Sequence, residues 1–169
     1  MPHHLRYQSQ NWATHHITSR CIQGFSFLKP TSEISAMIRG VLCYSVNSYK
    51  HGIELHHFAF LSNQFHHLIS AAKTKHMSGF LGHFKSNLAR ELGRIHDWHG
   101  TMWHKRFSNE ENLDEDALED IFKYITQNSV KESLVDHPNE WASVHGYHQL
   151  VEGRKTLRRV AESIQALSS

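Results

Sequence analysis

Two short segments separated by a polar turn constrain the fold of this chain more than any other feature of its sequence. Residues 53–60 are rich in β-branched and aromatic side chains, and a second apolar segment ends at Ile69. Ser62 and Asn63 stand between them, and residues of these types favour tight turns. The pattern therefore predicts two paired β-strands joined by a short turn.

The second of these strands brings two polar side chains to one face. Successive side chains of a strand point to opposite faces, so Gln64 and His66 share one face while His67 points to the other. Two polar groups held two residues apart on a rigid strand can bind one metal ion. The residues alone leave open a simpler alternative, which is a half-buried strand with satisfied polar side chains.

A strand and a helix are expected before this pair of strands. Residues 15–22 have the composition of a first strand, which would end at Gly24. Thr31 and Ser32 then favour a helix start, because both residue types cap helix N-termini well. Apolar side chains recur at helical spacing over residues 34–49, and Gly52 favours a stop soon afterwards.

A second helix and a closing strand are expected after the pair. Ser78 is a candidate N-cap, apolar side chains form one stripe over residues 77–95, and the helix should end near residues 97–100. Residues 101–107 are the expected closing strand. The order β-α-β-β-α-β predicts an α+β fold with a ferredoxin-like (RRM-like) antiparallel sheet and helices on one face.

The length of 169 residues is that of one domain with a substantial core. We expect a core over about residues 12–130 and a helical extension over about 131–169. Since no apolar run approaches the roughly 20 residues of a membrane span, no membrane association is expected. The chain start lacks the apolar region of a signal peptide, which favours a cytoplasmic protein. Cys21 and Cys43 have neither disulfide-framework nor metal-site spacing.

A third helix is expected after a strongly acidic segment. Seven acidic residues lie between Glu110 and Asp120, and acids in a first turn are favoured by the helix dipole, so they need no binding partner. Asn112 and Glu115 could form the helix cap. At helical spacing Tyr124 and Asn128 fall together at the border of the apolar stripe. From there Tyr124 could present its hydroxyl to the sheet edge, although packing is the commoner role of such a tyrosine.

Charge is unevenly distributed along the chain. Residues 1–109 hold 12 Lys and Arg against 4 Asp and Glu, while residues 110–169 hold 6 against 12. A basic body suits a phosphate-binding surface, although charged faces are often merely solvated.

Two segments sharpen this interpretation. Trp103 and Phe107 alternate with cationic side chains, a mixture that suits single-stranded nucleic acid but also fits an ordinary edge strand. The cations are His104, Lys105 and Arg106. Arg154 and Arg158 belong to an amphipathic basic helix near the C-terminus. That helix could clamp a DNA hairpin stem or simply be a solvated terminal helix.

Three motifs in this chain resemble those of one family. Asn63-Gln64-Phe65-His66-His67 resembles the Asn-His-hydrophobic-His-aliphatic strand of single-tyrosine HUH transposases, in particular the REP-associated tyrosine transposases of bacteria. Here glutamine stands at the first histidine position, and His67 stands where an aliphatic residue is usual. The segments 100–107 and 122–131 resemble the family's Trp-x-x-Arg-Phe and Arg-Tyr-Ile-x-x-Asn-Pro-Val-Lys segments. Together the resemblance covers roughly residues 15–148.

The resemblance implies an activity and a set of site residues. Tyr124 would be the nucleophile that forms a 5′-phosphotyrosine with single-stranded DNA carrying a hairpin. Mg²⁺ or Mn²⁺ would be bound by Gln64, His66 and Asn128. The DNA-binding residues would be Arg20, from the family's Thr-x-Arg opening strand, with Trp103, His104, Lys105, Arg106, Arg154 and Arg158. Because relatives of this type include dimers, a homodimer is a further expectation.

Two other functions remain open at this point. The first is a domesticated hairpin-binding protein that has lost DNA cleavage through the change of the first histidine to Gln64. The second is an RNA-binding module, because RNA-recognition domains use the same kind of sheet. The exposed sheet aromatics typical of those domains are not evident here, which makes this alternative the weaker one.

Overall fold

The structure, a computed structural model, describes residues 12–112 and 115–146. Its elements are, in chain order, β1 (Ala13–Arg20), a 3-10 turn (Ile22–Gly24), α1 (Ser32–Ser48), β2 (Ile53–Phe60), β3 (Gln64–Ala71), α2 (Thr74–His96), β4 (Ser108–Asn112), α3 (Glu115–Lys131) and a second 3-10 turn (Pro138–Glu140).

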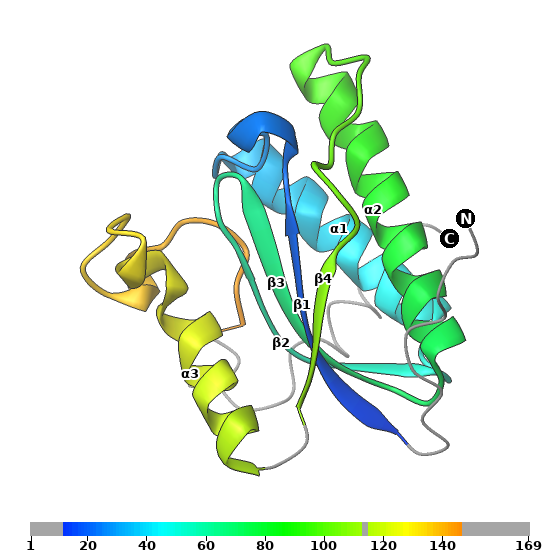
Figure 1. Ribbon diagram of the computed structural model, residues 1–169. Helices are drawn as coiled ribbons and strands as arrows, with labels where there is room; N and C mark the ends of the chain where they lie inside the picture. Colours follow the sequence, from blue (N-terminus) through cyan, green and yellow to red (C-terminus); the bar gives the residue numbers. More distant parts are fainter. Residues whose placement is uncertain (1–11, 113–114, 147–169) are drawn as a thin grey trace.

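The four strands form one sheet in the order β2-β3-β1-β4 (Figure 1). Every neighbouring pair is antiparallel. β2 and β3 are the pair expected from the sequence, since Phe60 lies opposite Phe65 across the turn. The α+β class and the ferredoxin-like order of strands are thus confirmed.

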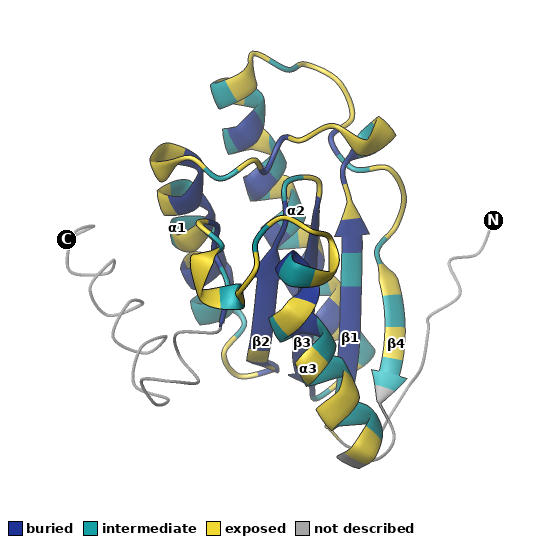
Figure 2. Ribbon diagram, turned by 90° about the vertical axis from the view of Figure 1, so that its left-hand side faces the viewer, coloured by how far each residue is buried: buried dark blue, intermediate teal, exposed yellow. Residues whose placement is uncertain are grey.

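The helices lie on both faces of the sheet rather than on one. α1 and α2 pack together on one face, while α3 lies across the other (Figures 1 and 2). The main core fills the space between the sheet and the α1–α2 layer, and its largest fully buried side chains include Ile17, Phe60, Phe65, Ile69, Phe80 and Phe84. The α3 face has only a small apolar cluster, formed by Ala59, Leu68 and Ile125. The remaining surface on that face is available for polar side chains.

The closing strand lies later in the chain than the sequence pattern predicted. Residues 101–107 form only an isolated bridge between Trp103 and Cys21, and β4 begins at Ser108. The alternation of aromatic and cationic side chains misled the prediction. Trp103 packs against Phe65 and donates its indole N–H to the Lys85 carbonyl at 3.1 Å, so it covers the end of the core. The actual strand, Ser-Asn-Glu-Glu-Asn, has little β-propensity but sits at the exposed sheet edge, where charged side chains are common (Figure 2).

The capping residue expected from the sequence sets the start of α1 but not the start of α2. Thr31 caps α1 by accepting a hydrogen bond from the Ile34 N–H at 3.1 Å, as expected. α2 begins at Thr74, four residues before the expected cap Ser78, and Lys73 caps it without a side-chain hydrogen bond. Burial of Met77 in the main core explains the earlier start. The side chains of the expected Asn112–Glu115 cap lie outside the described part of the structure.

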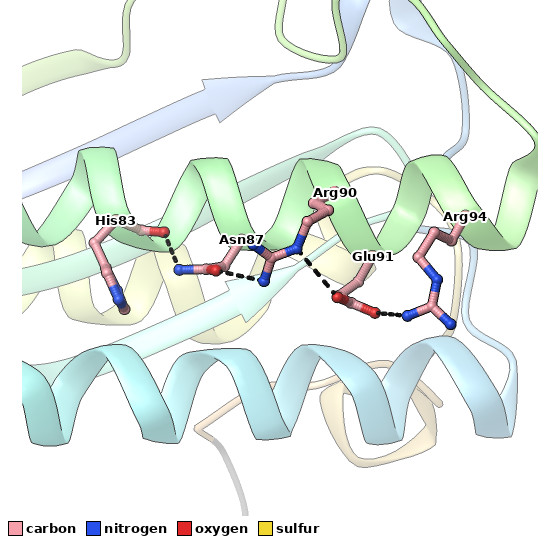
Figure 3. A network of polar contacts seen from close by, with 5 residues as sticks. All are labelled: His83, Asn87, Arg90, Glu91 and Arg94. Carbon is pink, nitrogen blue, oxygen red and sulfur yellow. Dashed lines mark hydrogen bonds and ion pairs between the residues drawn. The ribbon is translucent and has the colours of Figure 1, made fainter.

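Two arginines of α2 are engaged within their own helix (Figure 3). Arg90 donates to the Asn87 side-chain oxygen at 2.8 Å and lies 3.4 Å from Glu91. Arg94 donates to the other Glu91 oxygen at 2.9 Å. These exposed contacts contribute little stability. They also lie on the α1–α2 side of the sheet, which makes both arginines poor candidates for a ligand on the α3 face.

His67 is a polar residue in the middle of the main core. Its side chain is fully buried, and neither ring nitrogen has a hydrogen-bond partner among the described residues. The surrounding rings belong to Phe60, Phe65, Phe80 and Phe84, with centroids 4.6–6.1 Å away. Burial, with smaller effects of neighbouring histidines, lowers the pKa of His67 to about 3. His67 therefore points to the face opposite Gln64 and His66, as the alternation of side chains along the strand predicted. Its unpaired ring nitrogens lower the stability of the fold.

Replacing His67 with leucine is expected to stabilise the protein. An unsatisfied buried polar group costs about 1–3 kcal/mol, whereas the lost ring–ring contacts contribute about 0.5–1.5 kcal/mol. We expect a net gain of roughly 1–2 kcal/mol in the free energy of unfolding by urea at pH 7.5. His57→Leu is the matched control. His57 is also buried but lies 2.9 Å from the Thr126 hydroxyl, so its replacement should destabilise the fold. A lower stability of His67→Leu would contradict the argument.

The structure also describes the apolar character of the helices and the state of the two cysteines. Among the helices of the described residues, none combines the length and apolar character needed to cross a membrane. Cys21 and Cys43 are both free and buried.

Candidate functional site

The polar side chains of the α3 face converge between the two central strands and α3. β1 contributes His16 and Thr18 to this face, and β3 contributes Gln64 and His66. Antiparallel register sets Thr18 directly opposite His66. His66 contacts both His16 and Thr18, and the two histidine rings contact Tyr124 of α3. These four residues, together with Gln64 on the same face of β3, are called the polar cluster.

Gln64 and His66 lie where the alternation of the second strand predicted. Gln64 is the first residue of β3, opposite Arg20 in the register, and its side chain is 6% exposed. His66 is 2% exposed. Its Nδ1 atom lies 3.1 Å from the Thr18 hydroxyl and 3.2 Å from His16 Nε2. Its Nε2 atom is buried without a hydrogen-bond partner among the described residues.

Tyr124 lies over the middle of the sheet rather than at its edge. Its ring meets the His66 ring edge-on, with centroids 5.6 Å apart, and meets the His16 ring in the same way at 6.0 Å. Both partners belong to the central strands. The Lys131 ammonium group lies over the Tyr124 ring, 4.7 Å from its centroid. These contacts place the Tyr124 ring over the central strands, because α3 crosses this face of the sheet. The expectation that its hydroxyl reaches the sheet edge stays a prediction.

Asn128 follows Tyr124 by one helical turn on the side of α3 that faces the sheet. Its side chain is fully buried, and within the described residues neither its amide oxygen nor its amide nitrogen has a hydrogen-bond partner. α3 runs towards the turn between β2 and β3, since Ile125 packs on Leu68 whereas Ser129 and Leu61 line one hollow. Asn128 is therefore nearer than Tyr124 to the end of the sheet at which Gln64 begins β3.

The electrostatic surroundings keep His66 neutral. Burial lowers the pKa of His66 to about 3, with further contributions from His16 and from the positive charge of Arg20. A neutral imidazole has one unprotonated nitrogen, and that nitrogen can bind a metal ion. The low pKa means that this lone pair stays available throughout the physiological range of pH.

The donor set on this face fits a divalent cation with neutral ligands. No group of three or more His, Cys, Asp or Glu side chains in the described ranges could hold a metal ion. Gln64 and Asn128 can each supply an amide oxygen, and His66 can supply Nε2. Oxygen donors suit Mg²⁺ and Mn²⁺. A set without a carboxylate should bind such an ion weakly unless a phosphate of the substrate completes it.

Two residues of the cluster, and a third that contacts it, carried no functional assignment from the sequence. His16 contacts both His66 and Tyr124, Thr18 contacts His66, and Glu110 of β4 lies 3.3 Å from His16 Nδ1. Alternation along residues 15–18 could have paired His16 with Thr18. Their meeting with His66 depends on the register between β1 and β3, which no local pattern reveals.

Four of the residues expected to bind DNA, namely Arg20, His104, Lys105 and Arg106, belong to the end of β1 and to the loop that is hydrogen-bonded to it. The His104 backbone N–H donates to the Arg20 carbonyl at 2.9 Å, so the loop that carries Lys105 and Arg106 is joined to the end of β1. All four side chains are exposed. Trp103 is half-buried against the core and is less available for stacking on a base. Arg154 and Arg158 lie outside the described residues.

Comparison with solved structures finds a REP-associated tyrosine transposase bound to a REP hairpin. The TM-score is 0.73 at 17% sequence identity, and the match covers 90% of this chain and 86% of that chain. A protein of Deinococcus radiodurans R1, provisionally described as a transposase, matches with a TM-score of 0.49 at 16% identity over 74% of this chain and 94% of that one. That second similarity is too low to support a conclusion. No model of a known protein family matches the sequence, and no curated protein is significantly similar to it. The first match shows that this chain shares the transposase's fold.

Proposed function

We propose that this protein is a transposase-like DNA strand transferase that acts on single-stranded DNA carrying a hairpin. The observation that carries the proposal is the contact of Tyr124 with His66, at 5.6 Å between ring centroids, beside the unpaired Nε2 atom of His66. These contacts occur in a chain that shares its fold with a REP-associated tyrosine transposase bound to a REP hairpin. Fold alone would not assign an activity, which has to come from the site.

The chemistry assigned to Tyr124 is attack on a DNA phosphodiester. Its hydroxyl oxygen forms a bond to phosphorus, the bond to the 3′ oxygen breaks, and the hydroxyl proton leaves to a base or to solvent. The products are a 5′-phosphotyrosine and a free 3′-hydroxyl. Because the phosphoester bond is exchanged rather than hydrolysed, a 3′-hydroxyl of another strand can reverse the reaction without ATP. A tyrosine, with an ordinary pKa of about 10, needs help to act at neutral pH.

The residues around Tyr124 suit that need. Gln64, His66 and Asn128 would hold Mg²⁺ or Mn²⁺, which when bound polarises a phosphoryl oxygen and lowers the barrier to in-line attack. The Lys131 ammonium group, 4.7 Å from the centre of the Tyr124 ring, adds positive charge beside the proposed nucleophile.

The cations beside the site supply a binding surface for DNA. Arg20, Lys105 and Arg106 would contact phosphates around the scissile bond, and such contacts make DNA binding weaken with salt. A homodimer and a cytoplasmic location remain part of the proposal because family resemblance and sequence features favour them.

One observation favours a second function. The metal-binding set holds glutamine at the first position and has no carboxylate, so a protein that binds hairpins without cleaving them is the alternative. Both functions predict salt-dependent binding of DNA. Only the first predicts a covalent protein–DNA adduct.

The deciding experiment is a search for that adduct. Single-stranded DNA from the regions flanking the gene would be incubated with the protein and Mn²⁺ or Mg²⁺, then separated on a denaturing gel. We expect a metal-dependent adduct from the wild type and at least an equal yield from Gln64→His, because that change restores the first histidine of the motif that the chain resembles. An adduct from Gln64→His alone would instead establish the hairpin-binding alternative. If neither protein forms one, the transferase proposal is wrong.

A further inference from the structure

A chain of side-chain contacts crosses the polar face from the edge strand to His66. Glu110 Oε2 on β4 lies 3.3 Å from His16 Nδ1. His16 Nε2 lies 3.2 Å from His66 Nδ1, and the two rings are stacked with centroids 5.4 Å apart. The chain ends at His66 Nε2, which is buried and unpaired among the described residues. His16 and Glu110 are directly opposite in the register of β1 and β4, so the backbone holds this contact in place.

The direction of the hydrogen bonds follows from the carboxylate. An ionised carboxylate only accepts, so His16 Nδ1 must carry the proton that it donates to Glu110. When the His16 imidazole carries a single ring proton, that proton is on Nδ1, and Nε2 is left as an acceptor. His66 Nδ1 must then donate to it, because two unprotonated nitrogens 3.2 Å apart would repel each other. The second nitrogen of His66 is therefore left unprotonated.

Thr18 agrees with this assignment but does not decide it. Its hydroxyl oxygen lies 3.1 Å from His66 Nδ1 and can either donate or accept a hydrogen bond. It would satisfy both tautomers of His66. The selection between the two tautomers therefore comes from Glu110 acting through His16.

We propose that Glu110 and His16 are positioning residues that hold His66 as its Nδ1–H tautomer and thereby keep Nε2 free to bind a divalent cation. The identity of that ligand rests on the proposed function, whereas the tautomer itself does not. Histidines that bind metals commonly donate their other ring N–H to a carboxylate or carbonyl, and loss of that partner typically lowers metal affinity about 10–100-fold. Here the carboxylate acts through a second imidazole.

The tautomer can be read directly in the metal-free protein. We would label the histidines with ¹⁵N, remove metal with a chelator and record long-range ¹H–¹⁵N spectra near pH 8, above the ordinary histidine pKa of about 6.5. An imidazole in water favours the Nε2–H tautomer, so an Nδ1–H tautomer of His66 in the wild type is the distinctive expected result. A wild-type His66 that carries its proton on Nε2 would overturn the proposal without any variant.

Variants of His16 separate tautomer control from a structural role. His16→Phe keeps a ring against His66 but removes the acceptor, so His66 is expected to shift towards Nε2–H. His16→Gln keeps an acceptor oxygen and should restore the Nδ1–H form. His15→Gln is the matched control, because His15 is the preceding residue of β1, points to the opposite face and contacts Asn109 at 3.1 Å. Persistence of the Nδ1–H form in His16→Phe would also overturn the proposal.

Metal affinity provides the second measurement, made without DNA or turnover. Titration of Mn²⁺ followed by electron paramagnetic resonance should show affinity lowered about 10-fold or more in His16→Phe and in Glu110→Leu. Glu111→Leu, a change at the neighbouring residue opposite His15, should leave the affinity unchanged. Equal affinities in all proteins would refute the link to the cation. If His66 has the expected Nδ1–H tautomer but no adduct forms, only the proposed function is refuted. If an adduct forms but His66 carries its proton on Nε2, only this inference is refuted.

Discussion

Tyr124→Phe is expected to abolish the covalent protein–DNA adduct while leaving the fold and DNA binding unchanged. Phenylalanine lacks the oxygen that would bond to phosphorus, so the yield of adduct should fall by at least about a thousand-fold, as is usual when a nucleophile is removed. The ring would keep its edge-on contacts with His66 and His16. The measurements are adduct yield on a denaturing gel, hairpin affinity and the free energy of unfolding.

Tyr44→Phe is the matched control for this change. Tyr44 lies on α1, on the far side of the sheet from the polar cluster, and it is 59% exposed. Loss of its hydroxyl should change none of the three measurements. If Tyr124→Phe still forms the adduct, another residue is the nucleophile, and mass spectrometry of the DNA-linked peptide would identify it. Loss of hairpin affinity together with the adduct would point to a role of Tyr124 in binding instead.

Local patterns in the sequence predicted the parts of the fold that depend on local physics. The alternation of β3 correctly placed His67 on the face opposite Gln64 and His66, because a strand leaves no other choice. The cap at Thr31 was also correct, since its side chain satisfies the free N–H of Ile34. These features need only the neighbouring residues of the chain.

Features that depend on distant residues were beyond such patterns. The aromatic alternation of residues 101–107 resembled a strand, but Trp103 uses its ring to cover the core near Phe65 and Lys85. The real edge strand has almost no apolar signal, because its solvent-exposed side chains have little to bury.

The candidate site likewise contains residues that local patterns predicted and residues that only the three-dimensional fold brings together. Gln64 and His66 were predicted to share a face because they belong to one strand. His16 and Glu110 come from two other strands, and only the register of the sheet brings them to His66. The acidity of residues 110–120 was assigned wholly to the start of a helix, whereas Glu110 lies in β4 and contacts His16. Tyr124 was assigned to the border of an apolar stripe, and its partial burial against the small apolar cluster confirms this. Its contacts with His16 and His66 depend on the placement of α3 across the sheet.

Buried histidines give this fold a weakness towards acid. Burial is the main reason that the pKa of His57 is lowered to about 4 and that the pKa values of His66 and His67 are lowered to about 3. Neighbouring histidines add to the effect, among them His145 beside His57. Each ring is neutral in the folded protein at a pH where the unfolded chain, with pKa 6.5, already binds protons. Acid therefore favours the unfolded state.

We expect stability to be nearly constant between about pH 7 and pH 8 and to fall steeply as the pH drops from about 6.5 towards 4. The unfolded state binds more protons throughout this window, so stability decreases with falling pH until the folded-state pKa values are reached. At pH 5 each buried histidine costs about 2 kcal/mol, and three together cost about 6 kcal/mol, comparable to the whole stability of many domains. Urea unfolding at pH 7.5, 6 and 5 and constant ionic strength measures the loss. His67→Leu should remove about a third of it, and an unchanged stability at pH 5 would show that these rings take up protons without unfolding.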